Sequence, residues 1–167
     1  MENEHKHHVV AWWTSGPAGI AKSDSAPNAI HFTAPPEFGG LEGRWIPEEL
    51  LMTAPASCFT TTFHTIAGCS KFEYADLAVE AEGTVGKTDN GYCFSEIVIR
   101  PSLTIPEEAQ REWAISLSDK AKARCLVSRA LVTTQKFEAW GRCLQAFTSV
   151  RGSRATRPLI SLAGGVL

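Results

Sequence analysis

Five cysteines are the residues of this chain whose chemistry could serve a reaction: Cys58, Cys69, Cys93, Cys125 and Cys143. Their spacings contain no CxxC pair and no arrangement typical of a zinc site. The odd number of cysteines and an N-terminus, MENEHKHH, without signal-peptide features both indicate a reducing compartment. The sequence therefore predicts a cytoplasmic protein without a metal site, whose thiols are either buried and inert or reactive.

Cys58 lies in the middle of a segment that should form a helix. Pro47, Glu48 and Glu49 mark the start of this helix, because proline fits the first turn and acids interact favourably with the positive end of the helix dipole. Residues 50–70 carry no formal charge, so we expect the helix to be buried nearly all round. Cys58 is therefore either an inert core residue or a functional residue that the helix positions.

The chain as a whole has the composition of a globular protein. Its 167 residues suit one domain, and its 44% hydrophobic and 20% charged residues exclude both a disordered and a membrane-spanning class. The uncharged segment is interrupted by Pro55, Ser57 and His64, whereas a membrane span needs about twenty apolar residues. A net charge of -2 gives no general attraction to nucleic acid or to an anionic membrane. We expect no nucleic-acid or membrane partner.

The remaining elements are mostly strands. An Asn-Gly pair predicts a tight hairpin turn, and the spacing of Thr104 and Glu107 predicts a capping box at the start of a second helix. In chain order, we expect strands over residues 7–15, 18–22 and 29–33, a proline- and glycine-rich loop over 34–44, hairpin strands over 74–85 and 92–105, a helix to about residue 124, a short helical segment over 126–132 and a strand over 133–140.

These elements predict a single domain over residues 1–140. Residues 141–167 would form a basic C-terminal extension, since this stretch contains four arginines and no acid. Such an extension is either flexible or packed on a partner chain.

Four motifs carry a resemblance to a known family: Phe38-Gly39-Gly40, PEELL at Pro47–Leu51, ASCF at Ala56–Phe59 and KAKARCLVS at Lys120–Ser128. With them, the chain resembles the OsmC/Ohr family, the osmotically inducible protein C and organic hydroperoxide resistance proteins. The resemblance covers about residues 7–140 and includes the order of the elements. It implies an α+β OsmC-like fold in which an antiparallel β-sheet wraps around two central helices, assembled as an intertwined homodimer.

The resemblance also implies a function, that of a thiol peroxidase that reduces organic hydroperoxides. By position, Cys58 corresponds to the peroxidatic cysteine, Cys125 to the resolving cysteine and Glu48 to the glutamate at the helix start. The family points to a dithiol, carried by a lipoyl protein, as the reductant, and no cofactor is required. A disulfide between the two cysteines would complete each cycle.

Cleavage of a peroxide needs a thiolate, and burial alone raises the pKa of a thiol, so a cation should lie beside Cys58. An arginine suits this role because its planar fork can bind the thiolate and a carboxylate together. Many family members supply this arginine from well upstream of the glutamate, but this chain has none before Arg44. Arg44 is therefore the candidate, anchored by Glu48, with Arg124 and Arg129 as alternatives.

Four aromatic residues near the motifs could line an apolar pocket for a lipid-like peroxide, or could be core residues of any fold: Phe38, Trp45, Phe59 and Phe63. The missing upstream arginine also supports a second hypothesis. In that hypothesis the protein is a non-catalytic OsmC-like dimer that binds a small hydrophobic ligand or senses redox state.

Overall fold

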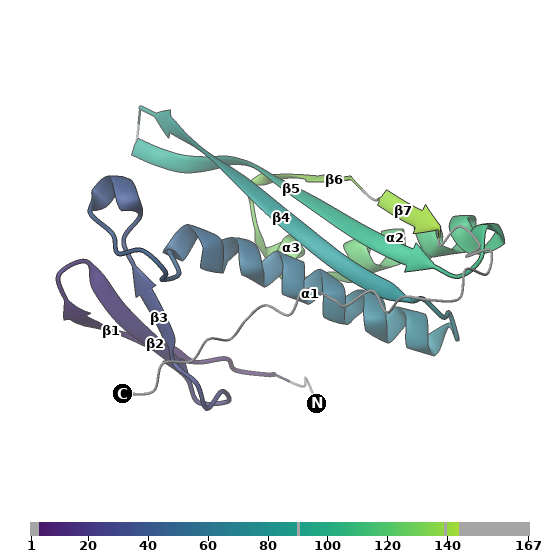
Figure 1. Cartoon of the computed structure of the whole chain (residues 1–167), viewed down its shortest axis with the longest axis horizontal. Helices are drawn as coiled ribbons and strands as arrows, with labels where there is room; N and C mark the ends of the chain where they lie inside the picture. Colours follow the sequence, from purple (N-terminus) through teal and green to yellow (C-terminus); the bar gives the residue numbers. More distant parts are fainter. Residues whose placement is uncertain (1–3, 90, 139, 144–167) are drawn as a thin grey trace, which may run out of the picture.

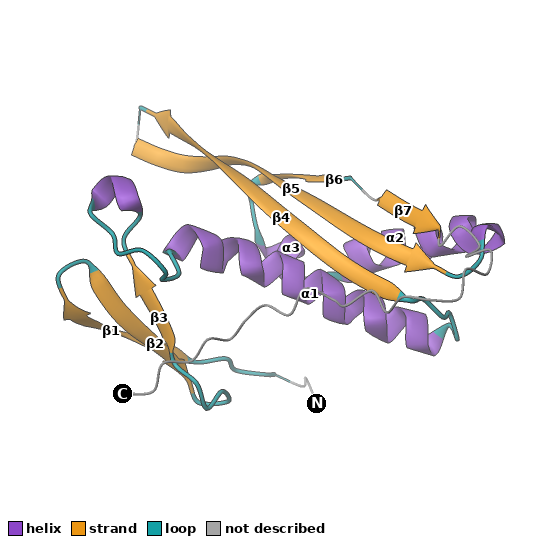
Figure 2. Cartoon of the chain, in the orientation of Figure 1, coloured by secondary structure: helices purple, strands orange, loops and turns teal. Residues whose placement is uncertain are grey.

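The computed structural model describes residues 4–89, 91–138 and 140–143, in which two β-sheets accompany three α-helices (Figures 1 and 2). A separate antiparallel sheet at the N-terminal side has the strand order β1-β2-β3. The strands and helices are β1 (Val9–Ser15), β2 (Ala18–Ser23), β3 (Ile30–Thr33), α1 (Pro47–Cys69), β4 (Asp76–Thr88), β5 (Gly91–Ile105), α2 (Arg111–Arg124), α3 (Leu126–Ala130), β6 (Thr134–Phe137) and β7 (Trp140–Cys143).

The second sheet is mixed, so the expectation of a purely antiparallel sheet is wrong. β4 and β5 form the predicted antiparallel hairpin, with pairs from Asp76 and Thr104 to Thr88 and Gly91. β6 and β7 both pair with β5 in parallel. The reason is the connection through α2 and α3, which carries the chain back to the beginning of the sheet before it runs along β5 again.

The capping box predicted at Thr104 and Glu107 is also wrong. Thr104 pairs with Asp76 inside β5, and the next residue, Ile105, is 1% exposed. α2 begins only at Arg111, after a short 3₁₀ turn over Glu108–Gln110. Burial of β5 in the sheet therefore prevails over the local capping signal.

α1 lies against one face of the second sheet and beside α2 (Figure 1). One stripe of residues spaced by four is buried, and its phenylalanines form the centre of the core: Pro55, Phe59, Phe63 and Ala67. The stripe with Ser57, Thr61 and Thr65 is exposed. The prediction that α1 is buried nearly all round is thus wrong for a single chain, because sheet and α2 cover only part of it.

The Phe38-Gly39-Gly40 motif has a backbone explanation. Gly39 has a φ of 77°, a left-handed conformation that glycine adopts without strain. A Cβ on Gly40 would lie 1.7 Å from the carbonyl oxygen of Ala34. Both glycines are therefore needed to fold the loop tightly between β3 and α1.

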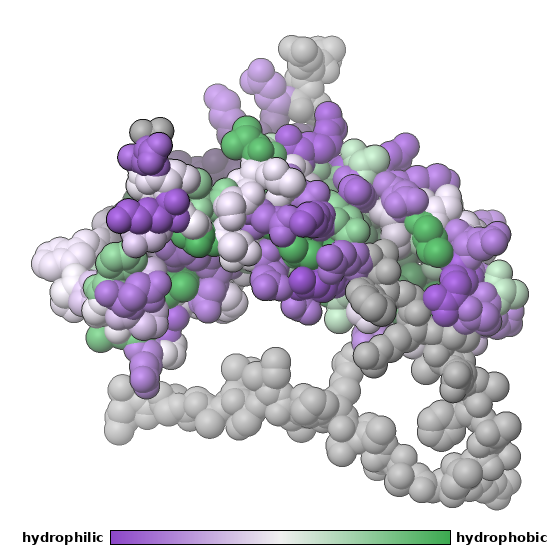
Figure 3. Space-filling model, turned by 90° about the horizontal axis from the view of Figure 1, so that it is seen from above, coloured by the Kyte–Doolittle hydropathy of each residue, from purple (hydrophilic) through white to green (hydrophobic). Residues whose placement is uncertain are grey.

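The surface is polar over the second sheet. Arg100 donates hydrogen bonds to Glu82 at 2.6 Å, to Glu138 at 2.9 Å and to Glu80 at 3.1 Å. Seen from above in Figure 3, hydrophilic side chains dominate and hydrophobic ones form separate small patches. None of the helices in the described part of the chain has the length and apolar character that crossing a membrane requires.

Residues 141–143, the start of the predicted basic extension, belong to β7 and pair with β5. The rest of that extension, residues 144–167, lies outside the described residues.

Candidate functional site

The structure brings Cys58 and Cys125 together, so that each sulfur acts on the pKa of the other. Cys58 projects from the middle of α1, and Cys125 is the single residue that separates α2 from α3. Cys58 is half-buried, whereas Cys125 is fully buried in the core cluster beside Phe59. Two thiols far apart in the sequence therefore share one site.

The pKa of Cys58 is lowered from its ordinary value. Burial raises this pKa, but hydrogen bonds to the sulfur outweigh burial. The groups that form them, from the largest effect to the smallest, are the backbone of Val127, the thiol of Cys125, the hydroxyl of Thr62 and the backbone of Leu126. All four groups are uncharged, so the thiolate is favoured by aligned dipoles rather than by a cation.

The pKa of Cys125 is raised. Its main cause is burial, and the neighbouring Cys58 sulfur raises the pKa further. Ser128 acts in the opposite direction through its side chain and backbone, and its Oγ donates to the Cys125 Sγ at 3.2 Å. The carbonyl of Ser128 in turn accepts a hydrogen bond from Gln135 Nε2 at 2.7 Å, which ties α3 to β6.

These opposite shifts assign different chemical states to the two sulfurs. Cys58 is the stronger acid of the two, because hydrogen bonds lower its pKa while burial raises the pKa of Cys125. A thiolate that touches a protonated thiol is suited to attack an electrophile and then to form a disulfide.

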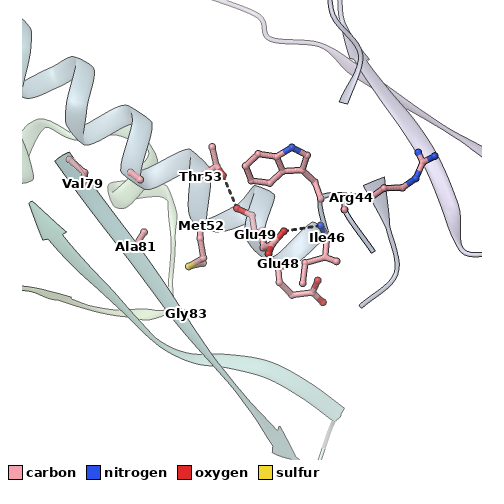
Figure 4. A pocket seen from close by; sticks show the side chains of 12 residues that line it. Arg44, Ile46, Glu48, Glu49, Met52, Thr53, Val79, Ala81 and Gly83 are labelled. Carbon is pink, nitrogen blue, oxygen red and sulfur yellow. Dashed lines mark hydrogen bonds between the residues drawn. The ribbon is translucent and has the colours of Figure 1, made fainter. Parts of the chain in front are cut away.

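A cavity of about 760 Å³ lies at the beginning of α1, beside the sheet (Figure 4). Its wall combines acidic side chains from the helix start with small or apolar residues of α1 and β4. The lining residues are Gly43, Arg44, Trp45, Ile46, Glu48, Glu49, Met52, Thr53, Ala56, Val79, Ala81 and Gly83. Neither Cys58 nor Cys125 is among these lining residues, and Cys58 follows Ala56, the last lining residue of α1, by two positions in the chain.

The two acids at the helix start have different environments. Glu49 Oε2 accepts a hydrogen bond from the backbone N–H of Ile46 at 3.3 Å, and so caps the helix. Glu48 Oε2 is buried and has no hydrogen-bond partner among the described residues. Glu49 thus performs the ordinary task of a helix-start acid, which leaves the carboxylate of Glu48 for another partner.

The structure does not bring Arg44 to Glu48 or to Cys58. The Arg44 Nη1 lies 3.2 Å from Nδ1 of His31, and its side chain turns away from Glu48 (Figure 4). The alternatives Arg124 and Arg129 are exposed. The role predicted for Arg44 stays a prediction that requires its guanidinium to leave His31.

The four aromatic residues predicted for a pocket occupy different places. Trp45 lines the cavity and is half exposed, while Phe38 is 65% exposed in the turn before α1. Phe59 and Phe63 lie in the core, with ring centroids 6.3 Å apart. Of the four aromatic residues, only Trp45 is therefore among the residues that line the cavity.

Several groups around the two sulfurs were not predicted from the sequence. Thr62 has a readable signal, because it lies one helical turn after Cys58 and so shares its face. Ser128 belongs to the recognised motif but had no assigned role. The backbone groups of Leu126 and Val127 could not be predicted, because residue types do not show where backbone groups point. Within the described ranges, no group of histidine, cysteine and acidic side chains could hold a metal ion.

Comparison with known proteins decides the family. The family model described as OsmC-like protein matches residues 40–139, which include both cysteines. The chain belongs to the OsmC-like family. The resemblance read from the four motifs is thereby confirmed, as is the mixed α+β OsmC-like fold.

Three relatives show how far the similarity extends. The uncharacterized protein YmaD of Bacillus subtilis is 28% identical over 131 residues, which cover 77% of this chain and 87% of YmaD. Peroxiredoxin OsmC of Escherichia coli is 28% identical over 85 residues, 51% of this chain and 59% of that protein. A crystal structure of an organic hydroperoxide resistance protein from Elizabethkingia anophelis superposes with a TM-score of 0.68 at 22% identity, over 86% of this chain and 99% of that one.

Proposed function

We propose that this OsmC-like protein is a thiol-dependent peroxidase that reduces organic hydroperoxides to alcohols. The observation that carries the proposal is the contact between a thiol with lowered pKa, Cys58, and a thiol with raised pKa, Cys125. The family includes a protein described as a peroxiredoxin and proteins described as organic hydroperoxide resistance proteins, which supports this substrate class.

The reaction has two steps on the protein. The Cys58 thiolate attacks the terminal oxygen of ROOH, the O–O bond breaks, and the alkoxide leaves and takes up a proton to become ROH. Cys58 is then a sulfenic acid. The Cys125 sulfur attacks the Cys58 sulfur, and its proton leaves with the hydroxyl group as water, which gives a Cys58–Cys125 disulfide. An external dithiol, which we propose is carried by a lipoyl protein, reduces the disulfide by exchange.

The cavity at the beginning of α1 provides room for the organic part of the substrate. Its wall has apolar side chains of Met52 and Val79 and the aromatic ring of Trp45. In the reactive arrangement we propose that the buried oxygen of Glu48 receives a cation, either Arg44 after it leaves His31 or a cation of a second copy of this chain.

A homodimer is part of this proposal. The exposed face of α1 contains Ser57, Thr61 and Thr65 and no charged side chain between residues 50 and 70. A long helix face without charged side chains can pack on a partner surface without burying a charge. Light scattering coupled to size-exclusion chromatography would give the dimer mass if this is correct, and the monomer mass if it is not.

The test of the proposed function is turnover of cumene hydroperoxide with dihydrolipoamide as the reductant. Wild type should consume peroxide catalytically, and Cys58→Ser should lose at least about a thousand-fold of this activity, since the alcohol is no nucleophile at neutral pH. Cys69→Ser, which removes an exposed thiol at the end of the same helix, is the matched control and should retain activity.

The second candidate function is binding of a small hydrophobic ligand without turnover. It is favoured by the size of the cavity and by the bond between Arg44 and His31, which leaves Cys58 without an arginine. A folded wild-type protein that binds cumene hydroperoxide but consumes none would decide for this candidate.

A further inference from the structure

We propose that Thr62 is a further residue of the reactive centre, whose hydroxyl donates a hydrogen bond to the Cys58 sulfur and stabilises the thiolate. The inference rests on the proposed role of Cys58 as the reactive thiol and deepens it. It names a neutral donor where the sequence predicts an arginine.

Thr62 lies on α1 four residues after Cys58. Residues four apart in a helix are neighbours on one face, so the Thr62 side chain lies next to that of Cys58. Both residues are half-buried, between the buried stripe of Phe59 and Phe63 and the exposed stripe of Thr61. The Thr62 hydroxyl acts on the Cys58 sulfur and favours its charged form.

The other threonines of α1 use their hydroxyl groups differently from Thr62. Each of them donates its hydroxyl to a backbone carbonyl of the preceding turn, which is the usual bond of a threonine inside a helix. These threonines are Thr53, Thr60, Thr61 and Thr65, with donor–acceptor distances of 2.8 to 3.1 Å. Within the described chain, Thr62 is the one threonine of α1 that forms no such carbonyl bond, so its proton is available to the sulfur.

The groups that act on the Cys58 sulfur are uncharged. A hydrogen bond to an ionised acceptor is stronger than one between neutral groups, so a single hydroxyl has a measurable effect on a thiolate. The titratable group that faces Cys58 from the α2–α3 junction is Cys125, whose own pKa is raised by burial. Arg44 is bonded to His31. The hydroxyl of Thr62 therefore adds to the donors of the Cys125–Val127 segment without a charge.

The experiment measures the pKa of each thiol without peroxide. Fully reduced protein is pulsed with iodoacetamide between pH 5 and pH 10, and alkylation of each cysteine is quantified by peptide mass spectrometry. The variants are Thr62→Val, which keeps the shape and removes the hydroxyl, and Thr62→Ser, which keeps the hydroxyl. Thr65→Val is the matched control, because its hydroxyl bonds the carbonyl of Thr61 in the same helix.

We expect Thr62→Val to move the Cys58 midpoint to higher pH and to lower its alkylation rate at pH 7 by about 3- to 10-fold. Thr62→Ser and Thr65→Val should stay within about two-fold of wild type. Cys69, at the far end of α1, should alkylate equally in all four proteins. An unchanged midpoint in Thr62→Val, or an equal loss in Thr62→Ser, would overturn the inference.

Two further measurements keep the outcome decisive. If circular dichroism shows that Thr62→Val is not folded, Thr62→Ala replaces it, and a Cys58 midpoint equal to that of Thr62→Ser overturns the inference. Alkylation requires no hydroperoxide, so the shift in Thr62→Val can be present in a protein that reduces no peroxide. That result would reject the proposed function and retain the role of Thr62.

Discussion

The middle and the beginning of α1 present two contrasting environments. In the middle, the Cys58 sulfur has uncharged hydrogen-bond donors from its own helix and from the α2–α3 junction. At the beginning, Glu48 places a buried carboxylate oxygen without a partner at the wall of a cavity, and Arg44 is turned to His31. The Cys58 sulfur therefore has its hydrogen-bond donors within a single chain, whereas the buried oxygen of Glu48 has no partner among the described residues.

This difference separates the two tasks of the proposed reaction. The acidity of the reduced Cys58 thiol is set by groups inside one packed unit, so we expect it without a second chain. The contacts of the buried carboxylate depend on a group that has to arrive, by movement of Arg44 or from a second chain. We therefore expect substrate binding at the cavity to depend on the position of Arg44 or on a second chain, whereas the acidity of Cys58 should not.

The largest effect beyond loss of Cys58 itself is expected from Cys125→Ser. Without the resolving thiol, we expect catalytic turnover to fall by about 10- to 100-fold, while the first reaction of Cys58 with peroxide continues. Intact-protein mass spectrometry should show the addition of one oxygen and then of further oxygens. Cys93→Ser, at an exposed position on β5, is the control. Unchanged turnover in Cys125→Ser would show that another thiol resolves the sulfenic acid.

The pH dependence of the first step sharpens the contrast between the two sulfurs. Because the pKa of Cys58 is lowered, its oxidation in a single turnover should rise with pH with a midpoint below the ordinary thiol pKa, and should be lost as pH falls through the lowered pKa. Rapid-quench sampling between pH 4 and pH 10 measures this. At neutral pH we expect a faster rate than that of an unperturbed thiol. A midpoint at or above the ordinary value would contradict the structure.

Substitution of the two neighbouring acids tests the region at the beginning of α1. We expect Glu48→Gln to lower peroxide turnover by about ten-fold, because it weakens the hold on a cation near the substrate. Glu49→Gln should leave turnover nearly unchanged and lower the free energy of unfolding by about 0.5–1 kcal/mol, since it weakens a cap. Steady-state kinetics and urea denaturation of both variants make the comparison. Equal turnover in the two variants would reject a special role for Glu48.

The smallest effect is expected from Arg44→Ala. The guanidinium is exposed and bonded to His31, so its removal should change turnover by no more than about two-fold where a second copy of the chain supplies the cation to Glu48. The variant His31→Ala tests whether the contact with His31 holds Arg44 away from Glu48. Turnover above that of wild type would show that it does, because a needed arginine is then released. A loss of ten-fold or more in Arg44→Ala would instead support the assignment made from the sequence.

Much of the local structure could be predicted because it depends on near neighbours in the chain. Pro47 and the acids after it predicted the start of α1, and alternating residues with an Asn-Gly turn predicted the β4–β5 hairpin. The capping box at Thr104 failed because β5 gains more from continuing to Ile105 inside the sheet than a helix would gain from one cap. The parallel pairing of β6 and β7 could not be read from their few residues.

By itself, the sequence determined the family, the α+β class and the order of most elements, and it singled out Cys58 and Cys125 as candidates, because motifs and periodicity are properties of nearby residues. Only the tertiary structure decided that Cys58 meets Cys125 beside neutral donors, that Glu49 caps the helix while Glu48 lines the cavity, and that Arg44 bonds His31. These outcomes depend on backbone groups and on packing between distant segments, and neither is encoded in the type of any single residue.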